Sequence, residues 1–450
     1  MTSDTQHDFD SLLDARPLGR FQYTLALLTA LVVLVDGFDT QVISLVAPEI
    51  AHEWHLSTAS FGLVFSAGLF GMVVGAAIFG TLGDRLGRKP TLLATLLVFG
   101  GLSLATPLVS SVGELTVLRF LTGLGLGGAV PLAISTVAEY LPTRVRSTAL
   151  SLSFCGYPAG VVVAGAITTD LLNAFGWRGV FVISGLVPLL MVPVMWLCYP
   201  ESARILVSRE RWARLDRIVA GLRLPVGGSR ELTFAASTRR RSAVRGLFAE
   251  GRAAGTLLLW VVLFLSLAMA YFLNSWMSIV ARNSGFSLRS SILAIAALNL
   301  GGIIGSFVLG RLADRYRTSV VVGAAYLIGA ACVAVIGQLQ GSSALLLVVA
   351  LIGGFFALGA QLCVVPLCAN FYPAAVRATG IGWSTGIGRI GGILGPSVGG
   401  LLISAGSGPS TLFAVAGGVT AAAGLSVFVF GFFEPRPRRV AERAAELAAT

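Results

Sequence analysis

The sequence contains few charged side chains for its length. Only 12% of its 450 residues are Asp, Glu, Lys or Arg, whereas 55% are hydrophobic and the mean hydropathy is +0.85. Soluble globular domains carry about 25% charged residues, because their surfaces face water. The composition therefore excludes a soluble globular protein and favours a chain that crosses a lipid bilayer.

Side chains that bind metals or react are also scarce. The three histidines, His7, His52 and His55, lie outside the apolar segments, so none is available to transfer a proton inside a membrane. The five cysteines lie inside apolar segments without metal-ligand spacing, and we expect small buried thiols. A nucleotide-binding loop of the form GxxxxGKS or GxxxxGKT is absent. We therefore expect no enzyme activity, no metal, no cofactor and no ATP-driven step, and a proton carrier inside the membrane has to be a carboxylate.

The placement of the basic residues decides how the formal charge of +11 is interpreted. If the N-terminus is cytoplasmic, 27 of the 32 basic residues lie in cytoplasmic segments, whereas Arg119 and Arg389 lie within apolar segments. An excess of cytoplasmic basic residues is typical of membrane proteins. The first 20 residues contain four aspartates and no basic stretch leading into an apolar one, so we expect no signal peptide. The charge therefore predicts a multi-pass protein with both termini in the cytoplasm, and no nucleic-acid partner.

Apolar segments long enough to cross a hydrocarbon core of roughly 30 Å recur along the whole chain. The sequence predicts an all-α integral membrane protein with twelve transmembrane helices. The predicted spans are residues 21–48, 59–82, 91–110, 115–139, 148–171, 179–199, 254–281, 290–312, 319–338, 344–370, 378–403 and 411–433.

The chain repeats at half its length. GTLGDRLGR at 80–88 matches GRLADRYRT at 310–318, and AEYLPTRVRSTA at 138–149 matches ANFYPAAVRATG at 369–380. Each repeat contains six helices, so both halves enter the membrane in the same orientation. The predicted parts are a cytoplasmic N-terminal tail (1–20), a first six-helix bundle (21–199), a cytoplasmic linker (200–253), a second six-helix bundle (254–433) and a cytoplasmic C-terminal tail (434–450).

The linker begins with SARILVSRERWARLDRIVAGL at 202–222, whose apolar spacing predicts one amphipathic helix on the inner membrane surface. We expect it to act as a linker and surface anchor.

Candidate gating residues lie in the loop at 80–90, in its repeat at 310–318 and before the eleventh predicted span. GTLGDRLGRKP at 80–90 joins the second and third spans, and its glycines permit a tight turn while its charged residues can form pairs that break in another conformation. A basic loop that only sets topology is the simpler interpretation. The candidate gating residues are Gly83, Asp84, Arg85, Arg88, Asp314, Arg315 and Arg377.

These loops, together with RFLTGLGLGG at 119–128, resemble the major facilitator superfamily over nearly the whole chain. A narrower resemblance comes from DGFDTQVISLVAPEI at 36–50, YFLNSW at 271–276 and FYPAAVRATGIGWSTGIGRIGGILGP at 371–396, which are similar to the aromatic acid:proton symporter family. That resemblance implies the major facilitator fold and transport roles for Asp36, Asp39, Arg119, Glu139, Arg377 and Arg389. Some relatives have a functional histidine between helices eight and nine, where this chain has Arg317, Thr318 and Ser319.

The charged residues inside the spans favour proton coupling. Asp36 and Asp39 are three residues apart and so lie on one helix face, where two close carboxylates repel and one is favoured to hold a proton. Each charge at the bilayer centre costs about 2.5–3.5 kcal/mol. Two alternatives remain: the aspartates support helix packing, or Asp39 pairs with Arg119. Glu139 is expected to form a cytoplasmic charge relay with Arg144 and Arg146.

Arg389 lies eleven residues into its span, about 16 Å deep. The spans of the second half contain no Asp or Glu, so we expect Arg389 to face the aspartates of the first half or a bound anion. An aromatic ring needs apolar walls and a few polar handles. Besides Arg389 and Asp39, the candidate substrate-binding residues are Phe38, Tyr157, Tyr271, Asn274, Trp276, Gln361 and Trp383, and Asn299 and Ser384 are further polar candidates.

We expect a monomeric, proton-coupled importer of a small aromatic carboxylate such as a hydroxybenzoate, in a bacterial inner membrane. The alternatives are a symporter for another organic acid such as muconate or for a sugar, a drug/proton antiporter, and a membrane sensor that does not transport. GILGPSVGG at 392–400 resembles a pattern that drug antiporters carry in the fifth helix, but the fifth span here reads FCGYPAGVVVAG. No long cytoplasmic domain is present to favour a sensor.

Overall fold

The computed structural model describes residues 7–226, 228–233, 243–249, 251–373 and 376–433. The chain forms two compact units. Unit 1 contains residues 1–238 together with 275–282 and 287–296, and unit 2 contains 239–274, 283–286 and 297–450. Most of the linker therefore belongs to unit 1, as do the end of one helix and the start of the next from the second half of the sequence.

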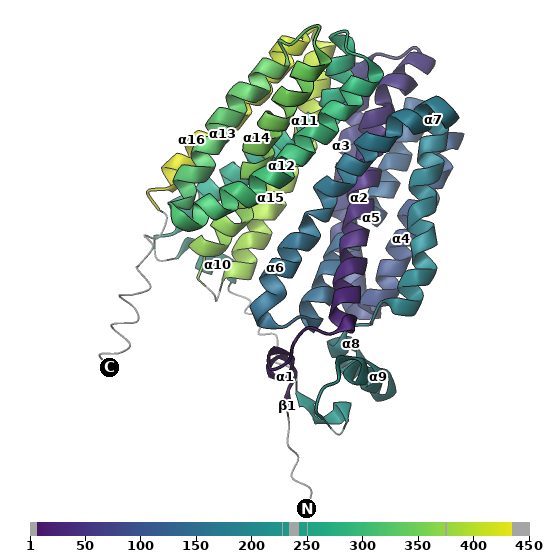
Figure 1. Ribbon diagram of the computed structural model, residues 1–450, viewed down its shortest axis with the longest axis vertical. Helices are drawn as coiled ribbons and strands as arrows, with labels where there is room; N and C mark the ends of the chain where they lie inside the picture. The colour runs from purple at the N-terminus through teal and green to yellow at the C-terminus, as the bar shows by residue number, and fades with distance from the viewer. Residues whose placement is uncertain (1–6, 227, 234–242, 250, 374–375, 434–450) are drawn as a thin grey trace, which may run out of the picture. The chain divides into compact units, whose positions relative to one another are not determined.

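Unit 1 contains the first helices of the chain (Figure 1). Its elements are β1 (His7–Asp8), α1 (Phe9–Asp14), α2 (Arg20–Glu53), a 3-10 turn (Thr58–Ser60), α3 (Phe61–Leu86), α4 (Arg88–Ala105), a second 3-10 turn (Thr106–Leu108), α5 (Val112–Tyr140), α6 (Thr143–Phe154), α7 (Gly156–Cys198), α8 (Ala203–Ser208), α9 (Trp212–Leu222), a third 3-10 turn (Ser229–Glu231) and β2 (Leu232–Thr233).

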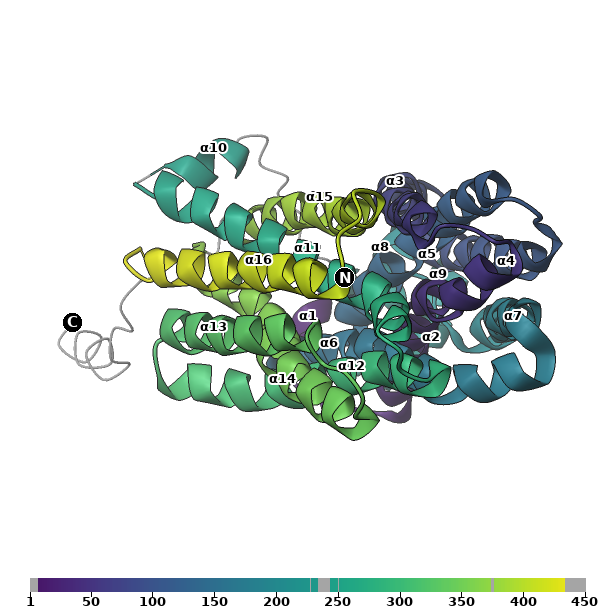
Figure 2. The same ribbon diagram turned by 90° about the horizontal axis from the view of Figure 1, so that it is seen from above.

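Unit 2 contains the remaining helices. They are α10 (Ala243–Phe248), α11 (Ala253–Asn283), α12 (Leu288–Arg315), α13 (Thr318–Ile336), α14 (Ser343–Phe371), α15 (Arg377–Ser404) and α16 (Pro409–Phe430), of which α11 and α12 each contribute one end to unit 1. Figure 2 shows α13 beside α16 and α14, with which it packs.

The prediction of twelve spans is confirmed. In the described part of the chain, eleven helices are long and apolar enough to cross a membrane. One of them, α7, is broken at Gly176, where a φ of 64° and a ψ of −179° interrupt the helical backbone. Figure 1 shows the chain reversing direction within α7, between its two arms. Its two arms are the predicted fifth and sixth spans, which brings the number of crossings to twelve.

Glycines let helices approach closely at equivalent places in the two halves. A Cβ at Gly75 in α3 would overlap the carbonyl oxygen of Leu124 in α5, and a Cβ at Gly305 in α12 would overlap that of Phe355 in α14. Small residues permit this approach between membrane helices, where packing rather than water drives association. Because Gly75 and Gly305 are 230 residues apart, the sequence repeat is also a packing repeat.

The prediction of one amphipathic helix at 202–222 is wrong. The segment forms α8 and α9, separated at Glu210, whose φ of 55° cannot continue a right-handed helix. Leu215 and Val219 of α9 are buried in the apolar core of unit 1. The apolar face of α9 therefore packs on the protein itself.

Candidate functional site

An acid–base pair is buried inside unit 1. The Arg119 Nη1 atom of α5 lies 3.8 Å from an Asp39 carboxylate oxygen of α2, and the two side chains are only 4% and 0% exposed. Removing one member of such a pair leaves an uncompensated buried charge. The structure therefore realises the alternative in which Asp39 pairs with Arg119.

Hydroxyl groups from two further helices complete the surroundings of Asp39. Ser103 of α4 donates a 2.7 Å hydrogen bond to Asp39 Oδ1, and Ser184 of α7 donates to the same oxygen. Four helices thus fix one carboxylate. Hydrogen bonds to a charged carboxylate are among the stronger ones, so the two serines tie Asp39 firmly to α4 and α7.

The guanidinium of Arg119 has its own partners. It donates a 2.8 Å hydrogen bond to Thr106 Oγ1 and lies 4.9 Å from the ring centroid of Phe181. A cation over an aromatic face gains electrostatic stabilisation where water is excluded. Arg119 is therefore held by an acid, a hydroxyl and an aromatic ring.

Two other predicted residues of α2 lie close to Asp39 in the sequence and are also buried. Asp36 is 2% exposed and Phe38 is 7% exposed. Gly37, between them, packs against the backbone of half-buried Tyr157 in α7, where a Cβ would overlap the Tyr157 carbonyl. The first span is thus pressed against the fifth at the predicted acidic motif.

The predicted residues of unit 2 lie on α11, α12, α14 and α15. Asn299 donates a 2.8 Å hydrogen bond to Asn274 Oδ1, so these two polar candidates are joined. Tyr271 packs its ring against Gly392 of α15. Gln361 of α14 is half-buried.

Trp276 belongs to unit 1, where it is fully buried and contacts Phe65 edge-on with a centroid distance of 5.5 Å. Trp276 therefore packs inside the protein, and none of its surface is exposed.

Arg389 and Trp383 lie on α15. Arg389 is half-buried, and among the described residues of unit 2 the only acidic one is Asp314, with which it forms no ion pair. Trp383 is 46% exposed and borders a hollow of about 530 Å³. Thr379, Gly382, Trp383, Gly386, Ile387 and Ile390 line this hollow.

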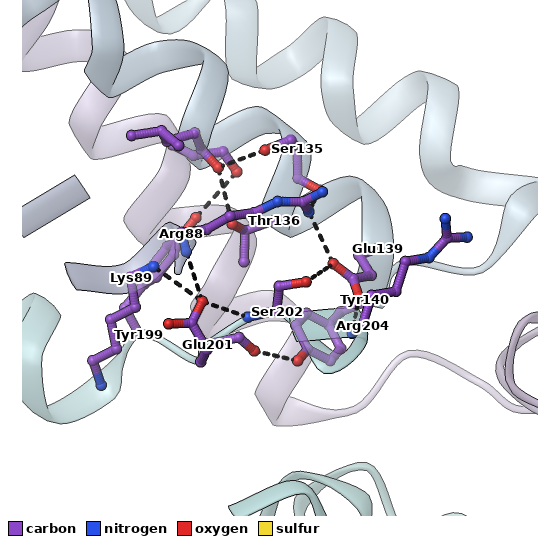
Figure 3. A network of polar contacts seen from close by, with 12 residues as sticks. Arg88, Lys89, Ser135, Thr136, Glu139, Tyr140, Tyr199, Glu201, Ser202 and Arg204 are labelled. Atoms are coloured by element: carbon purple, nitrogen blue, oxygen red, sulfur yellow. Dashed lines mark hydrogen bonds and ion pairs between the residues drawn. The ribbon is translucent and has the colours of Figure 1, made fainter. Parts of the chain in front are cut away.

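A polar network joins α4, α5 and the segment after α7 (Figure 3). Arg88 forms a 2.8 Å ion pair with Glu139 and donates a 2.9 Å hydrogen bond to the Ser135 carbonyl. Ser202 Oγ donates to Glu139 at 2.7 Å, and the backbone N–H of Arg204 donates to its other oxygen at 2.9 Å. Glu139 thereby links three segments at one end of unit 1.

Among the described residues Glu139 forms its ion pair with Arg88, and not with Arg144 or Arg146, the two arginines predicted to share a charge relay with it. Because α5 ends at Tyr140, the following turn carries both arginines away, while the start of α4 brings Arg88 to Glu139. Arg146 pairs instead with Asp10 at 2.9 Å, and Arg144 donates to the Arg16 carbonyl at 2.6 Å.

Glu201 is a network member that the sequence analysis missed. Its carboxylate accepts hydrogen bonds from the backbone N–H groups of Arg88 and Lys89, at 2.8 and 3.2 Å, and so caps the start of α4. A carboxylate is favourable at a helix N-terminus, where N–H groups have no partner within the helix. The Tyr140 hydroxyl donates to the Glu201 carbonyl at 2.5 Å. The acidic residue directly after the sixth span was the available signal.

The other gating candidates are placed as follows. Gly83 is buried against Leu132, whereas Asp84 and Arg85 are exposed, and the described residues of unit 1 give Asp84 no ion pair. Asp314 and Arg315 are exposed on α12.

Two repeated arginines keep the same contact. Arg377 Nε donates to the Tyr372 carbonyl at 3.3 Å, as Arg146 donates to the Leu141 carbonyl at 3.2 Å. The repeat in the sequence is therefore also a repeat in hydrogen bonding.

The start of the chain is a second feature that the sequence did not reveal. β1 pairs in parallel with β2 of the linker, and Phe9 and Leu13 of α1 are buried in the core of unit 1. Asp14 accepts 2.5 Å hydrogen bonds from the backbone N–H and the hydroxyl of Thr143 at the start of α6. These bonds lower the pKa of Asp14 below its usual value. We call residues 7–16 the N-terminal strap.

Twelve membrane spans in two repeated halves, with an acid and a base buried among them, define a multi-pass membrane transporter. The described residues contain no cluster of His, Cys, Asp or Glu that could hold a metal ion. The Major Facilitator Superfamily matches residues 29–298 and 259–450.

Several known proteins similar to this chain are aromatic acid transporters by name. The gallate transporter of Pseudomonas putida is 37% identical over 95% of this chain and 96% of that protein. The 4-hydroxybenzoate transporter PcaK of the same organism is 38% identical over 89% of this chain and 90% of its own length. The chain therefore belongs to the major facilitator superfamily and, within it, to the aromatic acid transporters.

Solved structures agree in fold. The inward-open xylose transporter XylE from E. coli has a TM-score of 0.70 and 18% identity, covering 94% of this chain and 99% of its own. A bacterial homologue of the human lysosomal transporter Spinster has a TM-score of 0.67 and 19% identity, covering 93% and 97%. At this identity the likeness concerns the fold alone.

Proposed function

We propose that the protein is a proton-coupled symporter that imports a small aromatic carboxylate, such as a hydroxybenzoate, across a bacterial inner membrane. The names of similar proteins, which include gallate, 4-hydroxybenzoate and benzoate transporters, support this substrate class. They also favour it over a sugar or a drug.

The observation that carries proton coupling is the buried pair of Asp39 and Arg119. Protonation of Asp39 removes its attraction for Arg119, so a proton arriving here weakens a contact between α2 and α5. Asp36, three residues away on α2, provides a second carboxylate in the same span. A titratable pair inside a membrane protein is a functional candidate because it is costly to retain there.

The substrate anion is assigned to Arg389. In the described part of unit 2, no carboxylate of the spans neutralises this arginine, and a bound carboxylate can form two hydrogen bonds with a guanidinium. Counting only the groups near the midplane, two aspartates (Asp36, Asp39) balance two arginines (Arg119, Arg389), so an added substrate carboxylate makes the site net negative and favours uptake of a proton.

The network of Arg88, Glu139 and Glu201 is assigned to the cytoplasmic gate. The excess of basic residues in the loops and tails on its side supports a cytoplasmic location for this end and for both termini. The contacts join α4, α5 and α8, so separating these elements requires breaking several bonds to charged groups. The proposed transport cycle needs no cofactor, and a single polypeptide is sufficient to carry it out.

Uptake into proteoliposomes tests the proposal. Purified protein is reconstituted, a pH gradient is imposed with the inside alkaline, and a labelled panel of benzoates, phenylpropanoates, muconate and xylose is supplied. We expect accumulation of at least one aromatic carboxylate that collapses when a protonophore is added. Accumulation of muconate or xylose alone, or of an aromatic acid regardless of the gradient, would refute it.

A further inference from the structure

The hollow on α15 is lined by two glycines, Gly382 and Gly386, and extends along the helix to Ile390, the residue after Arg389. α15 contains glycines of two kinds. A Cβ at Gly388 or Gly391 would overlap atoms of α11, so these glycines serve helix packing. At Gly382 and Gly386, in contrast, no atom of the described residues lies within 4 Å of the position of a Cβ.

Gly382 and Gly386 are therefore not needed for close helix packing. Glycine within a helix costs about 1 kcal/mol relative to alanine, so two unneeded glycines weaken α15 without a structural return. Their effect is to leave space, since any side chain at either position would project into the hollow that both residues line.

An aromatic wall stands at one end of this space. The Trp383 ring stacks on the Trp260 ring of α11 with a centroid distance of 5.9 Å and an angle of 19° between the planes. The Phe248 ring of α10 meets Trp260 edge-on at 5.6 Å and 86°. Among the described residues none accepts a hydrogen bond from the buried Trp260 N–H, so no hydrogen bond of this indole competes with its contacts to the neighbouring rings. Stacking on Trp260 thus holds Trp383 in place, while 46% of the Trp383 surface stays exposed.

A positive charge, Arg389, follows further along the same helix. Arg389 is six residues beyond Trp383, which is about 9 Å along the helix axis. Gly386 is three residues from each of them, so it lies on the helix surface between the two. Because the Arg389 side chain is long, its guanidinium can turn back toward Gly386, so that one ligand can place an aromatic ring against Trp383 and a carboxylate on Arg389.

From these observations we infer that the hollow is the ring site for a monocyclic aromatic carboxylate. Trp383 and the two glycines receive the ring, Arg389 receives the carboxylate, and Trp260 is a positioning residue that acts through Trp383. The inference rests on the proposed function, because it takes its ligand class from it, and it adds the location of the ring and the role of Trp260.

A series of substitutions at Gly386 tests the glycine lining of the hollow. Gly386→Ala, Gly386→Val and Gly386→Leu place side chains of growing volume in the hollow. We expect the KM for 4-hydroxybenzoate in proteoliposome exchange to rise with volume, by about tenfold or more for leucine, where the ring is blocked. The matched control is Gly418 of α16, which is also exposed with no atom within 4 Å of a Cβ and lies outside the hollow. Its series should leave KM unchanged.

Substitutions at Trp260 test the positioning role. Trp260→Leu removes the stacking partner and Trp260→Phe retains an aromatic ring. The readout is the ratio of the inhibition constants of cyclohexanecarboxylate and benzoate, which isolates the aromatic contact. Aromatic pairs are worth enough to predict a ratio reduced about three- to tenfold in Trp260→Leu, with most of it restored in Trp260→Phe. A purely structural role would lower the amount of active transporter and leave the ratio unchanged.

The outcomes separate the two proposals. If the wild-type protein exchanges no aromatic acid, the proposed function fails. If it does and Gly386→Leu keeps the wild-type KM in folded protein, or the Trp260→Leu ratio equals that of the wild type, the ring site is refuted while the function stands. Melting temperatures of all variants establish that the comparison is made on folded protein. If Gly386→Leu does not fold, the Gly386→Ala value decides.

Discussion

At the scale of single residues, the free-energy cost of burying charged groups is concentrated at the pair of Asp39 and Arg119. Asp39 and Arg119 are almost fully buried, yet each makes several contacts to oxygen, nitrogen or an aromatic ring. Buried pairs are poor sources of stability but are costly to break one side at a time. Such a pair is well suited to a switch, because a proton removes one charge without removing the side chain.

This coupling predicts non-additive losses of stability. Asp39→Asn and Arg119→Gln should each lower the free energy of unfolding by about 3–5 kcal/mol, because each leaves one charge buried alone. The double variant should lose less than the sum of the two. Chemical or thermal unfolding in detergent measures all three. Additive losses would show that the two side chains are not coupled.

Glu201 allows a second test at this scale. Glu201→Ala removes the acceptor for two N–H groups at the start of α4 and should cost about 0.5–2 kcal/mol, as loss of a helix cap does. Glu201→Gln keeps one acceptor oxygen and should cost less. Glu49→Ala, which changes an exposed carboxylate of α2, is the control for melting temperature. Equal melting temperatures for Glu201→Ala and the control would remove the capping role.

At the scale of elements, apolar length predicted the spans because a bilayer imposes one length on every crossing. The local events that hydropathy does not encode were missed. The break between α8 and α9 depends on a positive φ at Glu210, and the ordered start of the chain depends on contacts with residues more than 100 positions away. Arg88 could not be assigned to Glu139 from the sequence, since the pair forms only once α4 and α5 lie together.

The N-terminal strap predicts a response to acid. The pKa of Asp14 is lowered in the folded protein from its usual 3.8, so its contribution to docking is present at neutral pH and is lost as pH falls below that value through the lowered pKa. Hydrogen exchange of residues 9–14 should therefore be slow at pH 7 and become faster, after correction for intrinsic rates, as the pH is lowered step by step below 3.8.

Asp14→Ala should give the fast exchange already at pH 7, because it removes both hydrogen bonds to Thr143. Asp170→Ala, at an exposed position of α7, should behave as the wild type. Protection in Asp14→Ala equal to that of the wild type at pH 7 would show that this carboxylate does not hold the strap.

At the scale of the whole molecule, the two halves repeat the same helices but differ in the charged residues of their spans. The glycine contacts and the arginine-to-carbonyl bonds repeat, whereas the acids of the spans lie in the first half and Arg389 lies in the second. The resemblance to a family and the repeat were sufficient to predict the fold. The spacing of the motifs identified the charged residues. The two serine hydroxyls that donate to Asp39 could be found only in the structure, because serine is too common in the spans to be singled out.

The proposed coupling of substrate movement to protons through Asp39 can be measured by comparing two proteins. Wild-type and Asp39→Asn proteins are reconstituted, and labelled 4-hydroxybenzoate is followed under an imposed pH gradient and, separately, in exchange without a gradient. We expect that Asp39→Asn retains exchange but no longer accumulates substrate against its concentration gradient. Accumulation in Asp39→Asn with wild-type pH dependence would contradict it.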